Sequence, residues 1–277
     1  DDAINKIKKK DFSYPFPKQI KKLKKINIKA VISVSLFGNL YDVRNIKKVC
    51  RKYRIKLIED AAQSFGSRDD KYISGNTGDF GCFSFYPTKS LGCYGDGGAI
   101  LVNKKSYHNR LKSIRVHGQK SSGIFERLGI TGRLDTLQAT VLLEKLKNFN
   151  KEMYKRNSIA KNYDKFFEQF SEIKTQKINK KTISARTVYS IKFNSEYLRN
   201  YVVEKLKNKK IGFGIYYKKP FHLQKVFKYL NLQKNDFPIA ENLSKNILSI
   251  PIDPYLNSNE ISKIKTIIKN AIKKFYS

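Results

Sequence analysis

Acidic residues and cysteines are scarce in this sequence. Its 277 residues include 57 lysines and arginines against 23 aspartates and glutamates, which gives a formal net charge of +34. The three cysteines, at positions 50, 82 and 93, do not have the spacing of a zinc site. We therefore expect no metal site, and the cysteine usage favours a reduced, cytoplasmic setting.

Long hydrophobic runs are also missing. No stretch of 18 apolar residues occurs, so no membrane-spanning helix is expected. Residues 1–6 lack the apolar core of a signal peptide, and the chain does not begin with methionine. We expect the chain to be the remainder of a longer protein. Its hydrophobic content of 40% is compatible with one large domain or two ordinary ones.

The basic excess permits a nucleic-acid or anionic-membrane partner. Only 11 of the 57 basic residues are arginine, however, and the lysines are spread over most predicted helices. This distribution is typical of compositional drift in an A/T-rich coding sequence. Because no nucleic-acid-binding module is recognisable, we expect no nucleic-acid partner, whereas an anionic small substrate would be favoured by such a surface.

Residues 81–100 are the most informative stretch. Phe83 and Phe85 are typical of a buried strand, and Pro87 ends it because proline cannot donate to a sheet ladder. Lys89 follows as the only cation of an apolar, glycine-rich segment. In such surroundings a lysine amine can be desolvated and become a nucleophile, although a lone loop lysine is more often simply solvated.

The preceding residues predict a βαβ unit. Apolar runs at 29–37 and 55–60 are typical of buried strands, and a helix capped by Asp42 is predicted between them, ending near residue 53. Two strands so connected should be parallel. Asp60 ends the second strand and should face the ligand crevice beyond the strand ends, with a turn cap as the alternative.

Further periodic segments predict an α/β domain followed by a smaller α+β domain. We predict strands at 98–102, 187–193, 212–217 and 248–251, a polar linker at 174–182, and helices at 18–25, 104–115, 195–207 and 261–275, with one long helix from residue 134. Ser195 is the expected cap of the helix at 195–207.

Five motifs follow one another at distinctive spacings. They are EDAAQS at 59–64, FSFYPTK at 83–89, GDGGA at 95–99, GRLDTLQA at 132–139 and LSIP at 248–251. As a set they resemble the DegT/DnrJ/EryC1/StrS family of sugar aminotransferases that use pyridoxal 5'-phosphate (PLP). The resemblance covers nearly the whole chain.

The resemblance implies a type I PLP-transferase fold, like that of aspartate aminotransferase. Residues 1–152 would form part of the PLP-binding large domain, and residues 153–277 the small C-terminal domain. Members of the family have several tens of residues before the equivalent of Lys29, including the first strands of the sheet and a helix N-terminus that holds the cofactor phosphate. We expect this part to be missing from the chain.

The resemblance also implies roles for five side chains. Lys89 would bond covalently to the aldehyde of PLP and later move the proton. Asp60 would pair with the pyridinium nitrogen, and Gln63 would lie against the ring or its hydroxyl. Ser84 would donate to the cofactor phosphate. Thr131 stands where relatives usually have asparagine, and it would reach the phosphate of the neighbouring subunit's cofactor.

Three further residues are expected at the substrate. Arg133 would bind a carboxylate because its planar fork suits bidentate contacts, with an ion pair to Asp135 or a contact at the helix start as the alternatives. Tyr216 and Tyr217 would line the sugar site, although tyrosines on a short strand are more often core residues. The motifs are most similar to those of enzymes that aminate a 3-keto nucleotide-sugar, including UDP-linked keto-uronic acids.

The implied function is transfer of an amino group from an amino acid, expected to be glutamate, to a keto nucleotide-sugar for cell-surface polysaccharide synthesis. The implied protein is a cytoplasmic homodimer with shared active sites and no membrane partner. A sister class dehydrates sugars with histidine in place of the lysine, and Lys89 argues against it. A truncated, non-catalytic remnant that acts as a structural or regulatory partner is the alternative.

Overall fold

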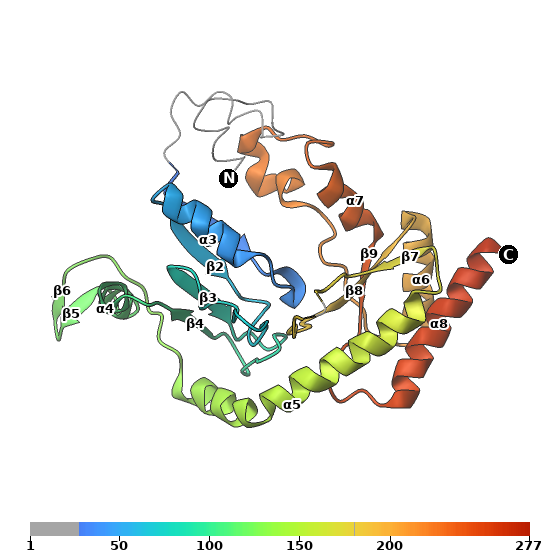
Figure 1. Ribbon diagram of the computed structural model, residues 1–277, viewed down its shortest axis with the longest axis horizontal. Coiled ribbons are helices and arrows are strands. Elements are labelled where there is room, and N and C mark those ends of the chain that lie inside the picture. Colours follow the sequence, from blue (N-terminus) through green and yellow to red (C-terminus); the bar gives the residue numbers. More distant parts are fainter. Residues whose placement is uncertain (1–27, 180) are drawn as a thin grey trace. The chain divides into compact units, whose positions relative to one another are not determined.

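The computed structural model describes residues 28–179 and 181–277 (Figure 1). The predicted helix at residues 18–25 lies outside this range. Within it, the chain forms two compact units. The sheet unit contains residues 29–157 and 178–187, and the C-terminal unit contains residues 158–177 and 188–277. The domain boundary at residue 152 stays a prediction, because compactness alone does not show that a segment folds independently.

The sheet unit is built on a four-stranded mixed sheet in the order β1-β2-β3-β4. β1 (Ala30–Val34), β2 (Lys56–Asp60) and β3 (Phe80–Ser84) are parallel, and β4 (Gly98–Leu101) is antiparallel to β3. This arrangement confirms the predicted βαβ unit.

The crossover helix α3 (Val43–Lys52) lies beside β2 (Figure 1). Asp42 caps it as predicted, accepting from the backbone N–H of Asn45 at 3.2 Å. Val43 and Cys50 are buried against Leu57 of β2. Burial of these apolar side chains stabilises the helix on the sheet.

The strand predicted at 29–37 ends earlier, at Val34. A single 3-10 turn, η1 (Leu36–Gly38), follows, and Phe37 within it has a left-handed backbone with φ of 59°. The Phe37 N–H donates to the Gln63 side chain at 2.7 Å instead of to a strand. A tertiary hydrogen bond therefore ends the strand before the apolar run ends.

Helix α4 (Lys105–Ile114) follows β4, and a two-stranded hairpin, β5 (Gln119–Ser121) and β6 (Ile124–Phe125), comes after it. The long helix α5 (Thr136–Phe167) then runs from the sheet unit into the C-terminal unit. Its Leu142, Phe149 and Met153 pack with Phe83 and Phe85 in the core of the sheet unit.

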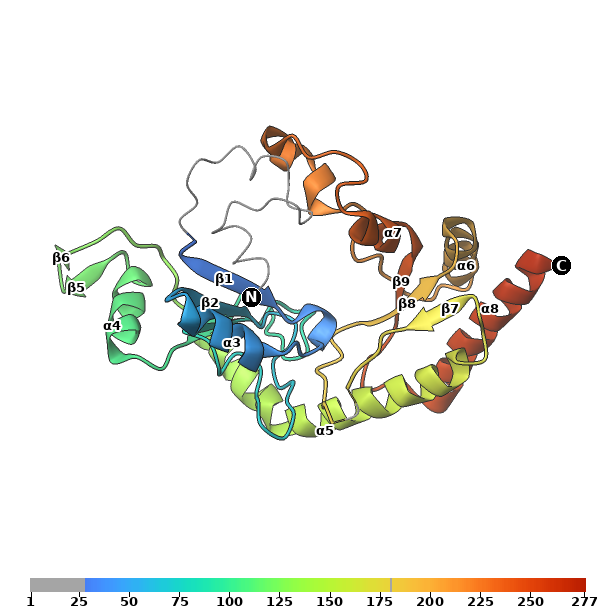
Figure 2. The ribbon, with the colours of Figure 1, turned by 45° about the horizontal axis from the view of Figure 1, so that its top comes forward.

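The C-terminal unit contains an antiparallel sheet in the order β7-β8-β9. Its elements are β7 (Ile173–Thr175), β8 (Tyr189–Phe193), α6 (Glu196–Asn208), the 3-10 helices η2 (Phe221–Leu223) and η3 (Lys225–Leu230), α7 (Pro238–Asn246), β9 (Ile247–Ile250) and α8 (Ser258–Tyr276). Helices α6 and α8 lie side by side (Figure 2). Ser195 caps α6 as predicted, accepting from Leu198 N–H at 3.1 Å.

Two predictions in this unit are wrong. The start of the supposed linker at 174–182 belongs to β7, because its backbone pairs with β8. The strand predicted at 212–217 is not formed, and only Gly214 makes an isolated bridge, to Ser249. In residues 28–179 and 181–277, no helix has the length and apolarity needed to cross a bilayer.

Candidate functional site

The carboxyl edge of the parallel strands brings Asp60 and Ser84 together. Asp60 is the last residue of β2 and stands opposite Cys82 in the register, while Ser84 ends β3 two residues later. Both side chains are half-buried. Because the register pairs Asp60 with Cys82 and side chains two residues apart share a face, the carboxylate and the hydroxyl lie on one face of the sheet at this edge.

The Asp60 carboxylate makes the turn cap considered from the sequence with one of its two oxygens. Its Oδ1 accepts from Ala62 N–H at 3.1 Å, which makes the turn cap. Its Oδ2 has no hydrogen-bond partner among the described residues and can accept from a ligand. Burial, followed by the nearby Asp60 charge, raises the pKa of the Cys82 thiol. Cys82 is therefore a neutral neighbour and not a competing thiolate.

Glu59, the residue before Asp60, organises the loop on the other side of β2. Its carboxylate is buried and accepts from the backbone N–H groups of Gly75 (3.2 Å), Thr77 (2.6 Å) and Gly78 (2.5 Å), and from the hydroxyl of Tyr72. Sequence reasoning missed this residue. The sequence could have indicated it, because side chains alternate along a strand and the adjacent carboxylates of Glu59 and Asp60 therefore point to opposite faces of the sheet.

Lys89 lies in a turn directly after β3. Its backbone N–H donates to Tyr86 O at 2.8 Å, and Pro87 occupies the second position, which suits proline's fixed φ. The Lys89 side chain is half-buried, and its amine has no hydrogen-bond partner among the described residues. The desolvation expected from the sequence is therefore partial in this chain.

The glycine-rich loop after Lys89 returns closely along β3. Phe85 N–H donates to Gly97 O at 2.7 Å, and Cys93 N–H donates to Phe85 O at 2.8 Å. A Cβ atom at Gly97 would lie 2.8 Å from Cys93 Sγ, and one at Gly98 would lie 2.8 Å from Phe83 O. Glycine is required at these positions by close packing, and this packing holds the Lys89 turn.

Helix α5 holds the same loop from its other side. Gln138 Oε1 accepts from Tyr94 N–H at 2.8 Å, and Lys145 Nζ donates to Gly92 O at 2.6 Å. Gln138 and Lys145 are seven residues apart, so they lie on one helix face. Their role was not predicted, although this spacing within an amphipathic helix is a signal for it.

Gln63 is engaged with the chain itself. Its side-chain oxygen accepts from Phe37 N–H at 2.7 Å, and its backbone oxygen accepts from the Thr187 hydroxyl at 2.6 Å. Both bonds lie within the sheet unit. Gln63 therefore joins three segments near the carboxyl edge, a role that its place in the sequence did not indicate.

Thr131 and Arg133 lie on the segment between the hairpin and α5, and both are exposed. The Thr131 hydroxyl is 3.5 Å from the His117 ring nitrogens. Arg133 makes no ion pair with Asp135 within the described part of the chain, so that one of its two alternatives is not formed. The structure shows no hydrogen bond from either residue to Asp60 or Lys89.

Tyr216 and Tyr217 belong to the C-terminal unit. Their side chains are 42% and 50% exposed, and their ring centroids are 5.8 Å apart in an edge-to-face arrangement. Neither is a core residue, and neither lies on a strand. Their exposed rings can contact a ligand.

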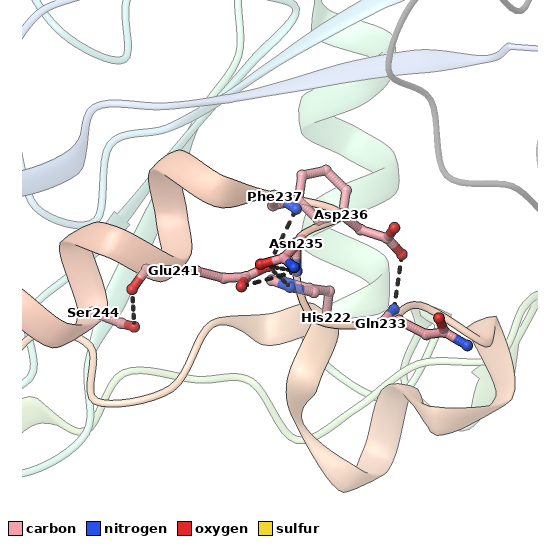
Figure 3. A network of polar contacts seen from close by, with 7 residues as sticks. All are labelled: His222, Gln233, Asn235, Asp236, Phe237, Glu241 and Ser244. Carbon is pink, nitrogen blue, oxygen red and sulfur yellow. Dashed lines mark hydrogen bonds and ion pairs between the residues drawn. The ribbon is translucent and has the colours of Figure 1, made fainter.

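A buried polar network supports the segment that follows these tyrosines (Figure 3). The Glu241 carboxylate accepts from Asn235 N–H at 2.8 Å, Phe237 N–H at 3.3 Å and His222 Nε2 at 3.0 Å. The bond from the Asn235 backbone, together with His222, lowers the pKa of Glu241. The network ties residues 221–237 to the first turn of α7.

The carboxyl edge therefore offers an amine, a carboxylate and a hydroxyl on a rigid support. No group of three or more histidine, cysteine, aspartate or glutamate side chains that could hold a metal occurs in the part of the chain that the structure describes. This donor set suits an organic cofactor with a carbonyl, a ring nitrogen and a phosphate.

Comparisons with known proteins identify relatives. The model of the DegT/DnrJ/EryC1/StrS aminotransferase family matches residues 7–269. The UDP-2-acetamido-2-deoxy-3-oxo-D-glucuronate aminotransferase of Pseudomonas aeruginosa is 36% identical over 242 residues, which are 87% of this chain and 66% of the relative. The pleiotropic regulatory protein of Geobacillus stearothermophilus is 32% identical over 248 residues, or 88% of this chain and 65% of that protein.

The fold is also found in a solved structure. The crystal structure of a DegT DnrJ EryC1 StrS aminotransferase from Brucella abortus matches with a TM-score of 0.83 and 36% identity, covering 92% of this chain and 67% of that one. This confirms the predicted fold class. The chain spans just under two thirds of the length of the two relatives above. By sequence and by structure, the chain belongs to the DegT/DnrJ/EryC1/StrS aminotransferase family.

Proposed function

We propose that this protein is a PLP-dependent aminotransferase that transfers an amino group from an amino acid to a keto nucleotide-sugar. The observation that carries the proposal is the placement of Asp60, Ser84 and Lys89 on β2, on β3 and in the turn after β3, at one edge of the sheet. The glycines at 97 and 98 support it, because a loop without Cβ atoms permits close approach to a flat ring.

The residues present fit the cofactor. Asp60 Oδ2 would hold a protonated ring nitrogen, and the Ser84 hydroxyl would donate to the phosphate. Lys89 would bind the aldehyde carbon through Nζ. When bound, PLP supplies an electron sink for cleavage of the bond to the α-hydrogen of the amino acid. Once the amino group of the donor has replaced it at the aldehyde carbon, Lys89 Nζ would take up and return this proton.

Lys89 is suited to this work because its segment carries no other cation and its side chain is half-buried. The turn fixes the backbone before the amine, and the hydrogen bonds of Gln138 and Lys145 on α5 fix the loop after it. The bond from Ala62 N–H to Asp60 Oδ1 fixes the orientation of the carboxylate, so Oδ2 points in one direction.

The substrate assignment rests on the names of relatives. The Pseudomonas aeruginosa relative is named for a UDP-linked 3-oxo-glucuronate, and an exposed arginine suits a uronic carboxylate. We assign Arg133 to that carboxylate and Tyr216 and Tyr217 to the sugar-nucleotide. The amino donor is proposed to be glutamate, and the product to be used for cell-surface polysaccharide synthesis in the cytoplasm.

We propose a homodimer with shared active sites. Thr131 and Arg133 are exposed and make no hydrogen bond to Lys89 or Asp60 in their own chain. This supports their action at the site of a neighbouring copy, where Thr131 would reach the cofactor phosphate.

A non-catalytic regulatory role is the second candidate. It is favoured by the 65% coverage of a relative named as a pleiotropic regulatory protein. Such a protein would retain the fold without stoichiometric cofactor binding.

The test is titration of the purified protein with PLP, followed by visible absorbance and by amino-group transfer to a UDP-linked 3-keto-sugar. We expect a stoichiometric absorbance band that is absent in Lys89→Ala and present in Lys105→Ala, an exposed lysine outside the site. A band retained in Lys89→Ala would refute the assignment. Absence of stoichiometric binding by the unmodified protein would favour the regulatory candidate.

A further inference from the structure

A polar pocket of about 840 Å³ lies in the sheet unit between α4 and the β5–β6 hairpin. The two elements are neighbours in both ribbon views (Figures 1 and 2). Helix α4 contributes Lys112 to the pocket lining and four further residues, Ser106, Asn109, Arg110 and Ser113. The spacing of these four residues, i, i+3, i+4 and i+7, places them on one helix face. None of the proposed cofactor residues lines this pocket.

The lining carries an excess of positive charge. Arg110 and Lys112 come from the helix, and Lys120 and Arg127 come from the hairpin region. The one acid, Glu126, binds both hairpin cations, with Nζ of Lys120 at 2.6 Å and a guanidinium nitrogen of Arg127 at 3.3 Å. Arg110 and Lys112 have no ion-pair partner among the described residues, so they are available to an anion.

Ser113 gives an independent indication of a ligand. The residue is 7% exposed, and its hydroxyl oxygen is buried without a hydrogen-bond partner in the described structure. Leaving a buried hydroxyl unsatisfied is costly, and such groups are rare in folded proteins. The carbonyls at a helix C-terminus repel anions. Here the Ser113 carbonyl accepts from Val116 and Gly118 N–H, at 3.0 and 2.9 Å, which reduces that repulsion.

We propose that this pocket binds a phosphate-bearing small molecule. Arg110 would contact the phosphate oxygens bidentately, Lys112 would add a second charge, and the Ser113 hydroxyl would donate to an oxygen. The volume is within the range of small-molecule sites and exceeds that of a single phosphate ion, which leaves room for a second phosphate or an organic group. The inference uses only the pocket's own residues and does not depend on the proposed aminotransferase activity.

The test measures the Tm of the purified protein with inorganic phosphate or diphosphate, against chloride at equal ionic strength. We expect diphosphate to raise the Tm of the unmodified protein and of Lys105→Gln, a charge-matched control on the same helix outside the pocket lining. Arg110→Gln should lose the shift. Ser113→Ala should have a Tm at or above that of the unmodified protein without ligand, yet bind diphosphate about tenfold more weakly by calorimetry.

Ser113→Ala separates binding from a structural role, because removal of an unpartnered hydroxyl should relieve a cost in the free protein. An equal shift in Arg110→Gln and Lys105→Gln would indicate general screening of the positive charge and would overturn the proposal. A Tm shift that survives in Arg110→Gln but is lost in Ser84→Ala would also overturn the proposal, because the phosphate would then bind at the carboxyl edge of the sheet, where the cofactor is proposed to bind. Absence of any shift would overturn it as well.

Discussion

Replacing Glu59 by glutamine should destabilise the sheet unit by about 2–5 kcal/mol. The Glu59 oxygens each accept two donors, Thr77 and Gly78 N–H on Oε1, and Gly75 N–H and the Tyr72 hydroxyl on Oε2. A glutamine NH₂ must replace one oxygen. The NH₂ group is better placed at the Oε2 position, where the Tyr72 hydroxyl can rotate to accept from it. Gly75 N–H, which also donates to Oε2, then has no acceptor. The cost combines one buried unsatisfied donor, about 1–3 kcal/mol, with loss of the charge from the remaining bonds.

The assay is urea-induced unfolding, followed by circular dichroism, with the transition midpoint and slope compared at neutral pH. The matched control is Glu144→Gln on α5, whose carboxylate makes an exposed ion pair with Lys147. Removal of such a pair should cost about 0–1 kcal/mol. If Glu59→Gln unfolds at the same urea concentration as Glu144→Gln, the argument that the carboxylate organises this loop is wrong.

Two further predictions concern alkaline stability and the loop after Lys89. Burial raises the pKa of Tyr41 to about 12 and also raises the pKa of Tyr72. The neutral forms of both tyrosines therefore stabilise the folded protein fully below about pH 10, and this stabilisation falls as the pH rises toward the folded pKa values. The loss is at most about 1.4 kcal/mol per pH unit for each tyrosine. Urea midpoints at about pH 9 and pH 11 should therefore differ less in Tyr41→Phe, and an unchanged difference would contradict this reasoning. Gly97→Ala should lower the free energy of unfolding by about 1–3 kcal/mol, because its Cβ would lie 2.8 Å from Cys93 Sγ. Gly212→Ala is the control and should not destabilise the protein, because its Cβ would have no atom within 4 Å. Equal urea midpoints for the two variants would refute the packing argument.

Local signals in the sequence predicted the elements whose stability depends on near neighbours. The caps at Asp42 and Ser195 each accept a backbone N–H three residues on, a contact that needs no tertiary partner. The Lys89 turn follows from proline at its second position. The βαβ unit follows from alternating apolar segments and the handedness of crossovers.

Elements that depend on distant partners were predicted less well. The apolar segment at 212–217 has the composition of a strand, but Gly214 alone finds a bridge partner, at Ser249. Lys174 and Thr175, which begin the predicted polar linker, belong to β7 because β8 offers their backbone a ladder. Backbone hydrogen bonds to a remote strand thus outweighed side-chain pattern in both directions.

The candidate site shows the same division. Residue types and strand ends indicated Lys89 and Asp60 as candidates, because an isolated lysine and a strand-end carboxylate are visible in the sequence, whereas the role of Ser84 was implied only by the family resemblance. The family assignment also rested on the motifs and is confirmed. Glu59, Gln138 and Lys145 were missed as supports, since their partners lie 13 to 53 residues away along the chain.

For residues 81–100, the sequence alone determined that the stretch contains a strand, a turn with one lysine and a glycine-rich loop. Only the tertiary structure decided how the lysine turn is held. Gly97 and Cys93 bond the loop back to Phe85, and Gln138 and Lys145 of α5 hold its far side. The physical reason is that turn chemistry acts over a few residues, whereas the direction of a hydrogen bond to a distant helix exists only after the chain has folded.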